Sequence, residues 1–208
     1  MGSILGDGCL EMSKWGSARL QLKQSAEKRE YIFWLFGELG NLCRSTPRQK
    51  KNTLQWYFST RYSKELASLW KHFYQDKKKI IPKNIGEMLS NPVSLAVWFM
   101  DDGTLDWREK SHYAFRLATN CFSKKENNLL VKVLKQNFGV DATVQTSRMR
   151  GVVYPRMHIG AAGRDKFLRH VAPFMLDCFR HKVPKIMFNP SETYPAQSGM
   201  DSDLLRSL

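Results

Sequence analysis

The stretch that decides the fold is residues 91–103, which read NPVSLAVWFMDDG. The Asn-Pro pair at its start is typical of a helix N-terminus, because Asn caps free backbone N–H groups and Pro suits the first turn. Apolar side chains follow on nearly every face, so the predicted helix should be buried. It ends in Asp101 and Asp102, and Gly103 stands where a glycine commonly terminates a helix. The sequence therefore predicts a short buried helix with two carboxylates at its C-terminal end.

Two carboxylates at that end are unfavourable by themselves, because the last turn of a helix already carries partial negative charge. A divalent cation is the simplest group that would offset the repulsion. Asp7-Gly8 follows a short apolar run in the same way. If the two helices pack about a pseudo-two-fold axis, their aspartates form an oxygen-only cluster suited to Mg²⁺, and metals so held suit phosphodiester hydrolysis. Each Asp-Gly pair taken singly is more typical of an ordinary turn.

Landmarks recur in matched order at a spacing of about 100 residues, which predicts a duplicated half. A Lys-Pro element closes each half, and an ammonium group there would stabilise negative charge on a phosphate. Amide side chains at predicted strand ends could order a hydrolytic water. We place the halves at residues 1–88 and 89–190, with a flexible tail at 191–208. The matched pairs are Asp7 with Asp102, Gln24 with Asn120, and Lys79 with Lys182.

The rest of the chain alternates between two hydrophobic periods, which predicts helices and half-buried antiparallel strands. Apolar residues at helical spacing predict helices over 26–39, 63–74, 123–138 and 164–175. Strict alternation predicts strands over 17–23, 54–59, 113–118 and 153–159, with Leu54 on the buried face of the second. The predicted class is α/β (α+β).

The charge of the chain indicates a polyanionic partner. Its 208 residues include 33 Lys and Arg against 19 Asp and Glu, for a net charge of +14. No apolar run approaches the length of a membrane helix, and no signal peptide is visible. The four cysteines are scattered without zinc or redox spacing, which favours free thiols in a reducing compartment. No zinc-protease motif or Gly-rich phosphate loop is present.

The outward faces of the predicted strands are rich in Arg, Lys, Gln and Tyr. At this net charge we expect them to contact nucleic-acid phosphates and base edges, although an ordinary solvated sheet face has the same pattern. The candidate contacts are Lys14, Arg19, Gln21, Lys23, Gln55, Tyr57, Arg61, Arg116, Gln145, Arg148, Arg150 and Arg156.

Residues 95–103 (LAVWFMDDG) resemble the nine-residue signature of LAGLIDADG homing endonucleases, and residues 2–8 (GSILGDG) resemble a second copy. The pair is similar to the single-chain, two-motif branch. The resemblance implies two pseudo-symmetric αββαββα halves, with two signature helices at the centre and two antiparallel sheets forming a DNA-binding saddle. It also implies a monomer that cleaves both strands of a double-stranded DNA target with Mg²⁺ or Mn²⁺, in a mitochondrion or chloroplast.

The resemblance assigns roles to the landmarks. The aspartate before each glycine would bind metal, and we place the metal site at Asp7, Asp102, Gly6 and, as a secondary ligand, Asp101. The catalytic candidates are Asp7, Asp102, Lys79, Lys182, Gln24 and Asn120. Two features depart from the family pattern. Only about five residues precede Asp7, so either the sequence is a piece of a longer protein or the first helix is stunted. A stunted helix would weaken the central interface and put activity in doubt. Asn120 stands in place of Gln or an acidic residue.

Two rival functions remain open. An intron RNA-binding splicing factor, or maturase, would use the same saddle on RNA, and a transcriptional regulator would bind DNA without chemistry. The intact aspartates and lysines favour the nuclease over both.

Overall fold

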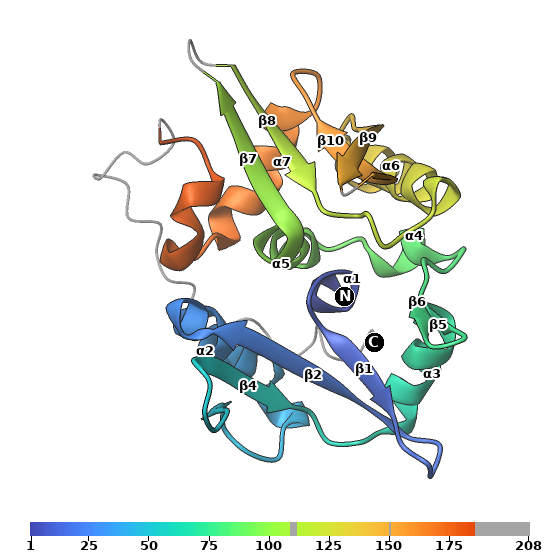
Figure 1. Ribbon diagram of the computed structural model, residues 1–208, viewed down its shortest axis with the longest axis vertical. Coiled ribbons are helices and arrows are strands. Elements are labelled where there is room, and N and C mark those ends of the chain that lie inside the picture. Colours follow the sequence, from blue (N-terminus) through green and yellow to red (C-terminus); the bar gives the residue numbers. More distant parts are fainter. Residues whose placement is uncertain (109–111, 150, 186–208) are drawn as a thin grey trace.

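Two antiparallel four-stranded sheets lie on either side of a central pair of helices in the computed structural model, which describes residues 1–108, 112–149 and 151–185 (Figure 1). The first sheet has the order β1-β2-β4-β3, and the second repeats it as β7-β8-β10-β9. This recurrence confirms the predicted pseudo-symmetric α/β (α+β) fold. The strands are β1 (Cys9–Met12), β2 (Ala18–Ser25), β3 (Arg48–Gln49), β4 (Gln55–Ser59), β7 (Gly103–Arg108), β8 (His112–Leu117), β9 (Thr143–Met149) and β10 (Val152–Ile159).

Longer helices cover one face of each sheet. In the first half these are α2 (Arg29–Leu39) and α3 (Lys64–Phe73), and in the second half α6 (Lys124–Phe138) and α7 (Arg164–Val171). Ser123 and Glu126 form the capping box that the sequence predicts at the start of α6. The remaining short elements are η1 (Ala26–Lys28), η2 (Gly40–Leu42), β5 (Tyr74–Gln75), β6 (Lys78–Lys79), α4 (Ile85–Met88), η3 (Ala172–Phe174) and η4 (Asp177–Lys182).

The central pair consists of α1 (Gly2–Leu5) and α5 (Pro92–Asp102), which pack against each other. The Asn91 side chain caps α5 as predicted, accepting a hydrogen bond from the backbone N–H of Val93 at 2.8 Å. A Cβ atom at Gly2 would lie 2.2 Å from the carbonyl oxygen of Ser94, so only glycine permits this close approach. All four residues of α1 are buried. No helix in the described ranges is both long and apolar enough to span a bilayer.

The sheets bury one face and present the other to solvent, as the alternating sequence predicts. In β2, Leu20 and Leu22 are buried, whereas Arg19, Gln21 and Lys23 lie on the opposite face. The prediction for Leu54 was wrong, because β4 begins only at Gln55 and the Leu54 side chain is 75 % exposed in the preceding loop. The proposed division at residue 88 stays a prediction, and the tail at 191–208 lies outside the described residues.

Candidate active site

The C-terminal ends of the two central helices meet, and their aspartates lie together. The backbone N–H of Asp7 donates to Asp101 Oδ2 at 3.1 Å, across the boundary between the two halves. Burial, reinforced by the charge of Asp7, raises the pKa of Asp102 to about 6. Because Asp102 directly follows Asp101, the Asp7–Asp101 hydrogen bond also places Asp7 and Asp102 at the same end of the helix pair.

Asp101 is held by protein donors on both of its oxygens. Its Oδ1 accepts from the Tyr31 hydroxyl at 2.9 Å and, more weakly, from Gln24 Nε2 at 3.5 Å, while Oδ2 accepts from Asp7. Burial and the charge of Asp7 raise the pKa of Asp101 to about 7. A Cβ atom at Gly6 would lie 2.5 Å from this carboxylate, so the glycine makes the space that Asp101 fills.

Gln24 joins the cluster, but its predicted counterpart does not. Gln24 lies near the end of β2 and donates to Asp7 Oδ2 at 2.7 Å. Asn120 lies exposed in the turn after β8 and donates to none of the three aspartates in the described part of the chain. The strand ends early there, because the Thr119 N–H bonds back to the Leu117 carbonyl at 2.9 Å. Gln24 lies 17 positions after Asp7, whereas Asn120 lies 18 positions after Asp102. The strand register that matches Gln21 with Arg116 therefore places Thr119, and not Asn120, at the position of Gln24.

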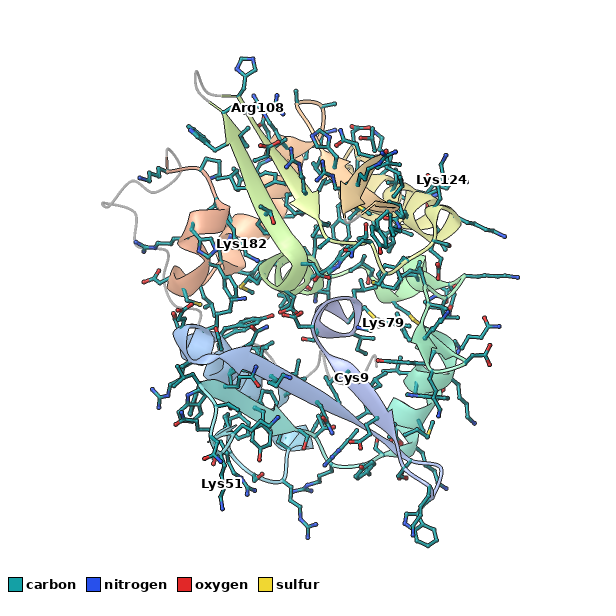
Figure 2. All side chains as sticks on the ribbon, in the orientation of Figure 1. Cys9, Lys51, Lys79, Arg108, Lys124 and Lys182 are labelled. Carbon is teal, nitrogen blue, oxygen red and sulfur yellow. The ribbon has the colours of Figure 1, made fainter. Side chains whose placement is uncertain are left out.

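The two predicted lysines lie on either side of the helix pair (Figure 2). Lys79 Nζ donates to the carbonyl oxygens of Gly6 and Gly8, at 2.9 and 3.0 Å. Lys182 Nζ donates to the Met100 carbonyl at 2.6 Å. Burial lowers the pKa of Lys79, and burial together with the charge of Lys28 lowers the pKa of Lys182 to about 8. Both lysines are close enough to Asp102 to favour its ionised form.

A groove of about 760 Å³ runs from Asp7 along the polar face of the first sheet. Basic, amide and hydroxyl side chains make up most of its lining, so it has the chemistry to accept a phosphate backbone. The predicted contact residues Arg19, Gln21, Lys23, Gln55 and Tyr57 all line it.

The second sheet presents a comparable polar face. Strand register places Arg116 opposite His158, and Arg156 opposite Gln145, on one face. The same register places Arg148 opposite Val153, on the other face, so the expectation that Arg148 shares the face of Gln145 was wrong. Arg148 lies three positions after Gln145 in β9, and side chains an odd number of positions apart in a strand point to opposite faces. Arg150 lies outside the described residues, while Lys14 and Arg61 lie in loops that flank the first sheet.

The oxygen donors at the helix ends suit a hard divalent cation. Asp7 and Asp102 offer carboxylates and Gly6 offers a carbonyl, which are ligands that Mg²⁺ prefers. Within the described ranges, no group of three or more His, Cys, Asp or Glu side chains could hold a metal without other ligands. Mg²⁺ commonly completes its shell with waters and substrate phosphates, so the residues present fit such an ion.

This geometry agrees with a comparison against known protein families. The sequence profile of the LAGLIDADG DNA endonuclease family matches residues 1–167. The chain belongs to this family. In LAGLIDADG terms, α1 and α5 carry the two signature motifs.

Individual LAGLIDADG relatives cover most of the chain. DNA endonuclease I-ChuI of Chlamydomonas applanata is 29 % identical over 200 residues, spanning 88 % of this chain and 91 % of that protein. The cytochrome b mRNA maturase bI2 of Debaryomyces hansenii is 25 % identical over 197 residues, spanning 89 % and 72 %. The solved structure of the homing endonuclease I-WcaI bound to its DNA recognition sequence has a TM-score of 0.75 at 25 % identity, covering 87 % of this chain and 82 % of that one.

Sequence reasoning missed several residues at or beside this LAGLIDADG site, among them Lys50, which lines the groove. Tyr31 belongs to the apolar stripe of α2, and nothing in the helical pattern shows that its hydroxyl reaches Asp101 in the other half. Glu11 and Asp106 lie on the polar sheet faces, where a basic chain leads one to expect basic contacts. The one available signal is that each follows the Asp of its half by the same number of positions.

Proposed function

We propose that this chain is a site-specific double-strand DNA endonuclease of the homing type, which hydrolyses phosphodiester bonds with a divalent metal. The observation that carries the proposal is that the Asp7–Asp101 hydrogen bond brings the two Asp-Gly motifs together at the ends of the central helices. Asp7 also lines a groove of mostly polar and basic side chains. One carboxylate from each half suits an enzyme that must cut two strands. The similarity to I-ChuI and to DNA-bound I-WcaI supports this function.

The proposed metal is Mg²⁺, with Mn²⁺ as a substitute, held by Asp7, Asp102 and the Gly6 carbonyl. When bound, it would supply an activated water and neutralise charge on the phosphate. Gly6 O accepts from Lys79 in the present structure and retains a second lone pair. Asp101, whose two oxygens both have protein donors, is better suited to positioning Asp7 and Gln24 than to binding metal.

The remaining side chains have distinct roles in the proposed reaction. Lys79 and Lys182 place ammonium groups beside the aspartates, where they would stabilise the negative charge that develops on a phosphate. Gln24 holds one oxygen of Asp7 and so limits the orientations of that carboxylate. Asn120 is exposed and donates to none of the aspartates within the described residues.

The test is cleavage of a plasmid library that carries randomised inserts. With Mg²⁺, we expect the linearised plasmids to share one insert sequence, and with excess EDTA we expect no linear product. Linear plasmids without a shared sequence, or full cleavage in EDTA, would contradict the proposal.

A splicing factor that binds intron RNA is the second candidate, and the similarity to the bI2 maturase favours it. The two functions differ in their need for the carboxylates. A maturase should promote splicing of its host intron equally well after Asp7→Asn, whereas a nuclease should lose DNA cleavage. Measuring both reactions with the same variant separates the two.

The proposed partner is double-stranded DNA, bound by a monomer with internal pseudo-two-fold symmetry. Each half supplies one sheet, so one chain can cover both halves of a target. We also propose an organellar location, mitochondrion or chloroplast, which tagging of the protein in its own cells would test.

A further inference from the structure

A carboxylate occupies the same position on the polar face of each sheet. Glu11 in β1 and Asp106 in β7 each lie four positions after the Asp of their own half, Asp7 and Asp102. The two strands also have matching register, because Cys9 pairs with Gln21 as Thr104 pairs with Arg116. These carboxylates are therefore pseudo-symmetric features of the two faces that we assign to DNA.

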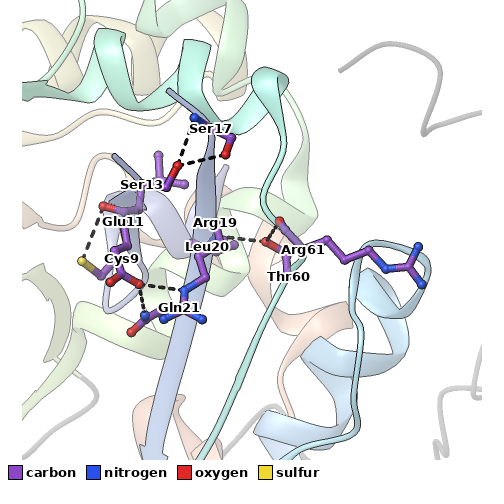
Figure 3. Close-up of polar contacts among 10 residues, drawn as sticks. Cys9, Glu11, Ser13, Ser17, Arg19, Leu20, Gln21, Thr60 and Arg61 are labelled. Carbon is purple, nitrogen blue, oxygen red and sulfur yellow. Dashed lines mark hydrogen bonds and ion pairs between the residues drawn. The ribbon is translucent and has the colours of Figure 1, made fainter. Parts of the chain in front are cut away.

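In the first half, Glu11 fixes an arginine by one side of its guanidinium group. Arg19 Nε donates to Glu11 Oε2 at 2.7 Å, and the Gln21 amide donates to the same oxygen (Figure 3). The ring of Tyr62 lies 5.0 Å from the Arg19 guanidinium carbon. The Arg19 side chain remains 32 % exposed, and within the described ranges its two terminal NH₂ groups have no hydrogen-bond acceptor.

In the second half, Asp106 holds Arg116 in the register position that Gln21 occupies in the first. Arg116 Nη2 donates to Asp106 Oδ2, and Arg108 Nη2 lies 3.7 Å from the same oxygen. Arg116 Nε is buried and has no partner in the described part of the chain, so this guanidinium is not fully satisfied.

Stability alone does not account for these carboxylates. The Arg19–Glu11 pair is partly exposed, and such ion pairs contribute little to folding. In both halves, a negative charge beside DNA repels the phosphates. A carboxylate that holds one side of a guanidinium does, however, restrict its rotamers and direct the remaining N–H groups outward. Arg19, held through Nε, keeps both terminal NH₂ groups for the paired O6 and N7 acceptors of guanine in the major groove. Arg116 is held through Nη2 and its Nε is buried, so Nη1 is the group that it can present to a base.

We propose that Glu11 and Asp106 are positioning residues for base recognition, each presenting an arginine, Arg19 or Arg116, to a G·C pair in its own half of the target. The inference rests on the proposed DNA-binding function. Within the described residues Lys23 and Arg61 have no ion-pair partner, so they are better suited to phosphates than to bases.

The test is selection of bound duplexes from a randomised DNA library in EDTA, so that bound DNA is not cut. The variants are Glu11→Ala, Glu11→Gln and Asp106→Asn. Glu11→Gln retains an acceptor for Arg19 Nε and guards against a folding failure of the Ala variant. The matched control is Asp141→Asn, which removes an ion pair of similar exposure between Asp141 and Lys135 at the end of α6.

We expect Glu11→Ala to reduce the preference for G about tenfold at one position in one half-site, with the other half-site unchanged. Glu11→Gln should restore part of that preference, and Asp106→Asn should act only on the opposite half-site. Non-specific affinity at low salt should rise in each variant, because a charge that repels phosphate is gone. A purely structural role would instead lower specific and non-specific binding together.

Unchanged base preferences in the Glu11 and Asp106 variants, or losses spread over both half-sites, would overturn the inference. So would an equal loss in Asp141→Asn. A wild-type chain that enriches no DNA sequence would overturn the proposed function itself, which is a different and recognisable result.

Discussion

The two halves of the molecule share a fold but differ at the axis where they meet. Each supplies a sheet of the same strand order, one helix of the central pair and an Asp-Gly pair. At the residue before the Asp, however, the first half has Gly6 and the second has Asp101, whose carboxylate bonds to Asp7, Gln24 and Tyr31 of the first half. Duplication therefore fixes the architecture, while single substitutions at the interface make the site asymmetric.

Substitution of the paired aspartates tests most directly whether the two halves contribute equally to cleavage. If both halves contribute one essential carboxylate, Asp7→Asn and Asp102→Asn should each reduce cleavage by roughly 10³-fold, because each would lose metal-assisted charge stabilisation. DNA binding should persist. Cleavage of a plasmid that carries the selected target measures the effect, and Asp165→Asn, on the exposed side of α7, is the control. If either Asn variant cleaves at the wild-type rate, the aspartate that it replaces is not essential for cleavage.

Lys79 and Lys182 test the comparison between the two halves further, because the contacts of the two lysines differ. Lys79 Nζ donates to the carbonyls of Gly6 and Gly8 in the first half, at 2.9 and 3.0 Å. Lys182 Nζ donates to Met100 in the second half at 2.6 Å and only weakly to Phe99, at 3.5 Å. We expect Lys79→Met and Lys182→Met each to slow cleavage by about 10²-fold. The slowing should be unequal between the two strands.

The measurement is the ratio of nicked to linear plasmid over time. Accumulation of nicked circles in both variants supports a separate role for each lysine. Equal slowing of both strands in both variants would indicate that the lysines act on one shared centre.

Substitution of Gly6, which lies against the Asp101 carboxylate, tests the asymmetry between the two halves through the free energy of unfolding. Gly6→Ala places a Cβ atom 2.5 Å from the Asp101 carboxylate and should lower the free energy of unfolding by about 1–3 kcal/mol. Gly37→Ala, in α2, meets nothing within 4 Å and should instead raise it by about 0.5–1 kcal/mol. Denaturant unfolding of both variants measures the difference. An equally stable Gly6→Ala protein would mean that the two central helices can separate without cost.

Substitutions of the two amide residues, Gln24 and Asn120, should have the smallest effects on the cleavage rate. Gln24→Ala removes the bond to Asp7 and should slow cleavage about 10-fold, whereas Asn120→Ala should change the rate by less than about 3-fold. Single-turnover rates on the selected target measure both. Similar losses in the two variants would show that Asn120 reaches the site once DNA is bound.

The fold was predictable from the sequence because its signals are local. The Asn cap, the all-apolar run and the terminal Asp-Asp-Gly define α5, and the period-two pattern defines the face of β2 that carries Arg19. The meeting of Asp7 with Asp102 was predictable only because the motif occurs twice.

Contacts between the halves were not predictable in the same way. Nothing local to Tyr31 indicates that its hydroxyl reaches Asp101, because that distance depends on how α2 packs against the central helices. Asn120 is not the counterpart of Gln24, because it lies one position further from its Asp, and strand register gives that position to Thr119. Arg148 is a different case, because strict alternation along the strand, which the sequence does show, already places it on the face opposite to Gln145.

The glycine opposite Asp101 also limits how the halves can be recombined. A homodimer built from two copies of the second half would bring two buried carboxylates into the space that now holds one carboxylate and a hydrogen atom. Like charges at that depth are mutually destabilising, so self-association of that half is disfavoured. A chimaera that joins this second half to the first half of another protein would need a residue as small as glycine at the position of Gly6, where it contacts Asp101.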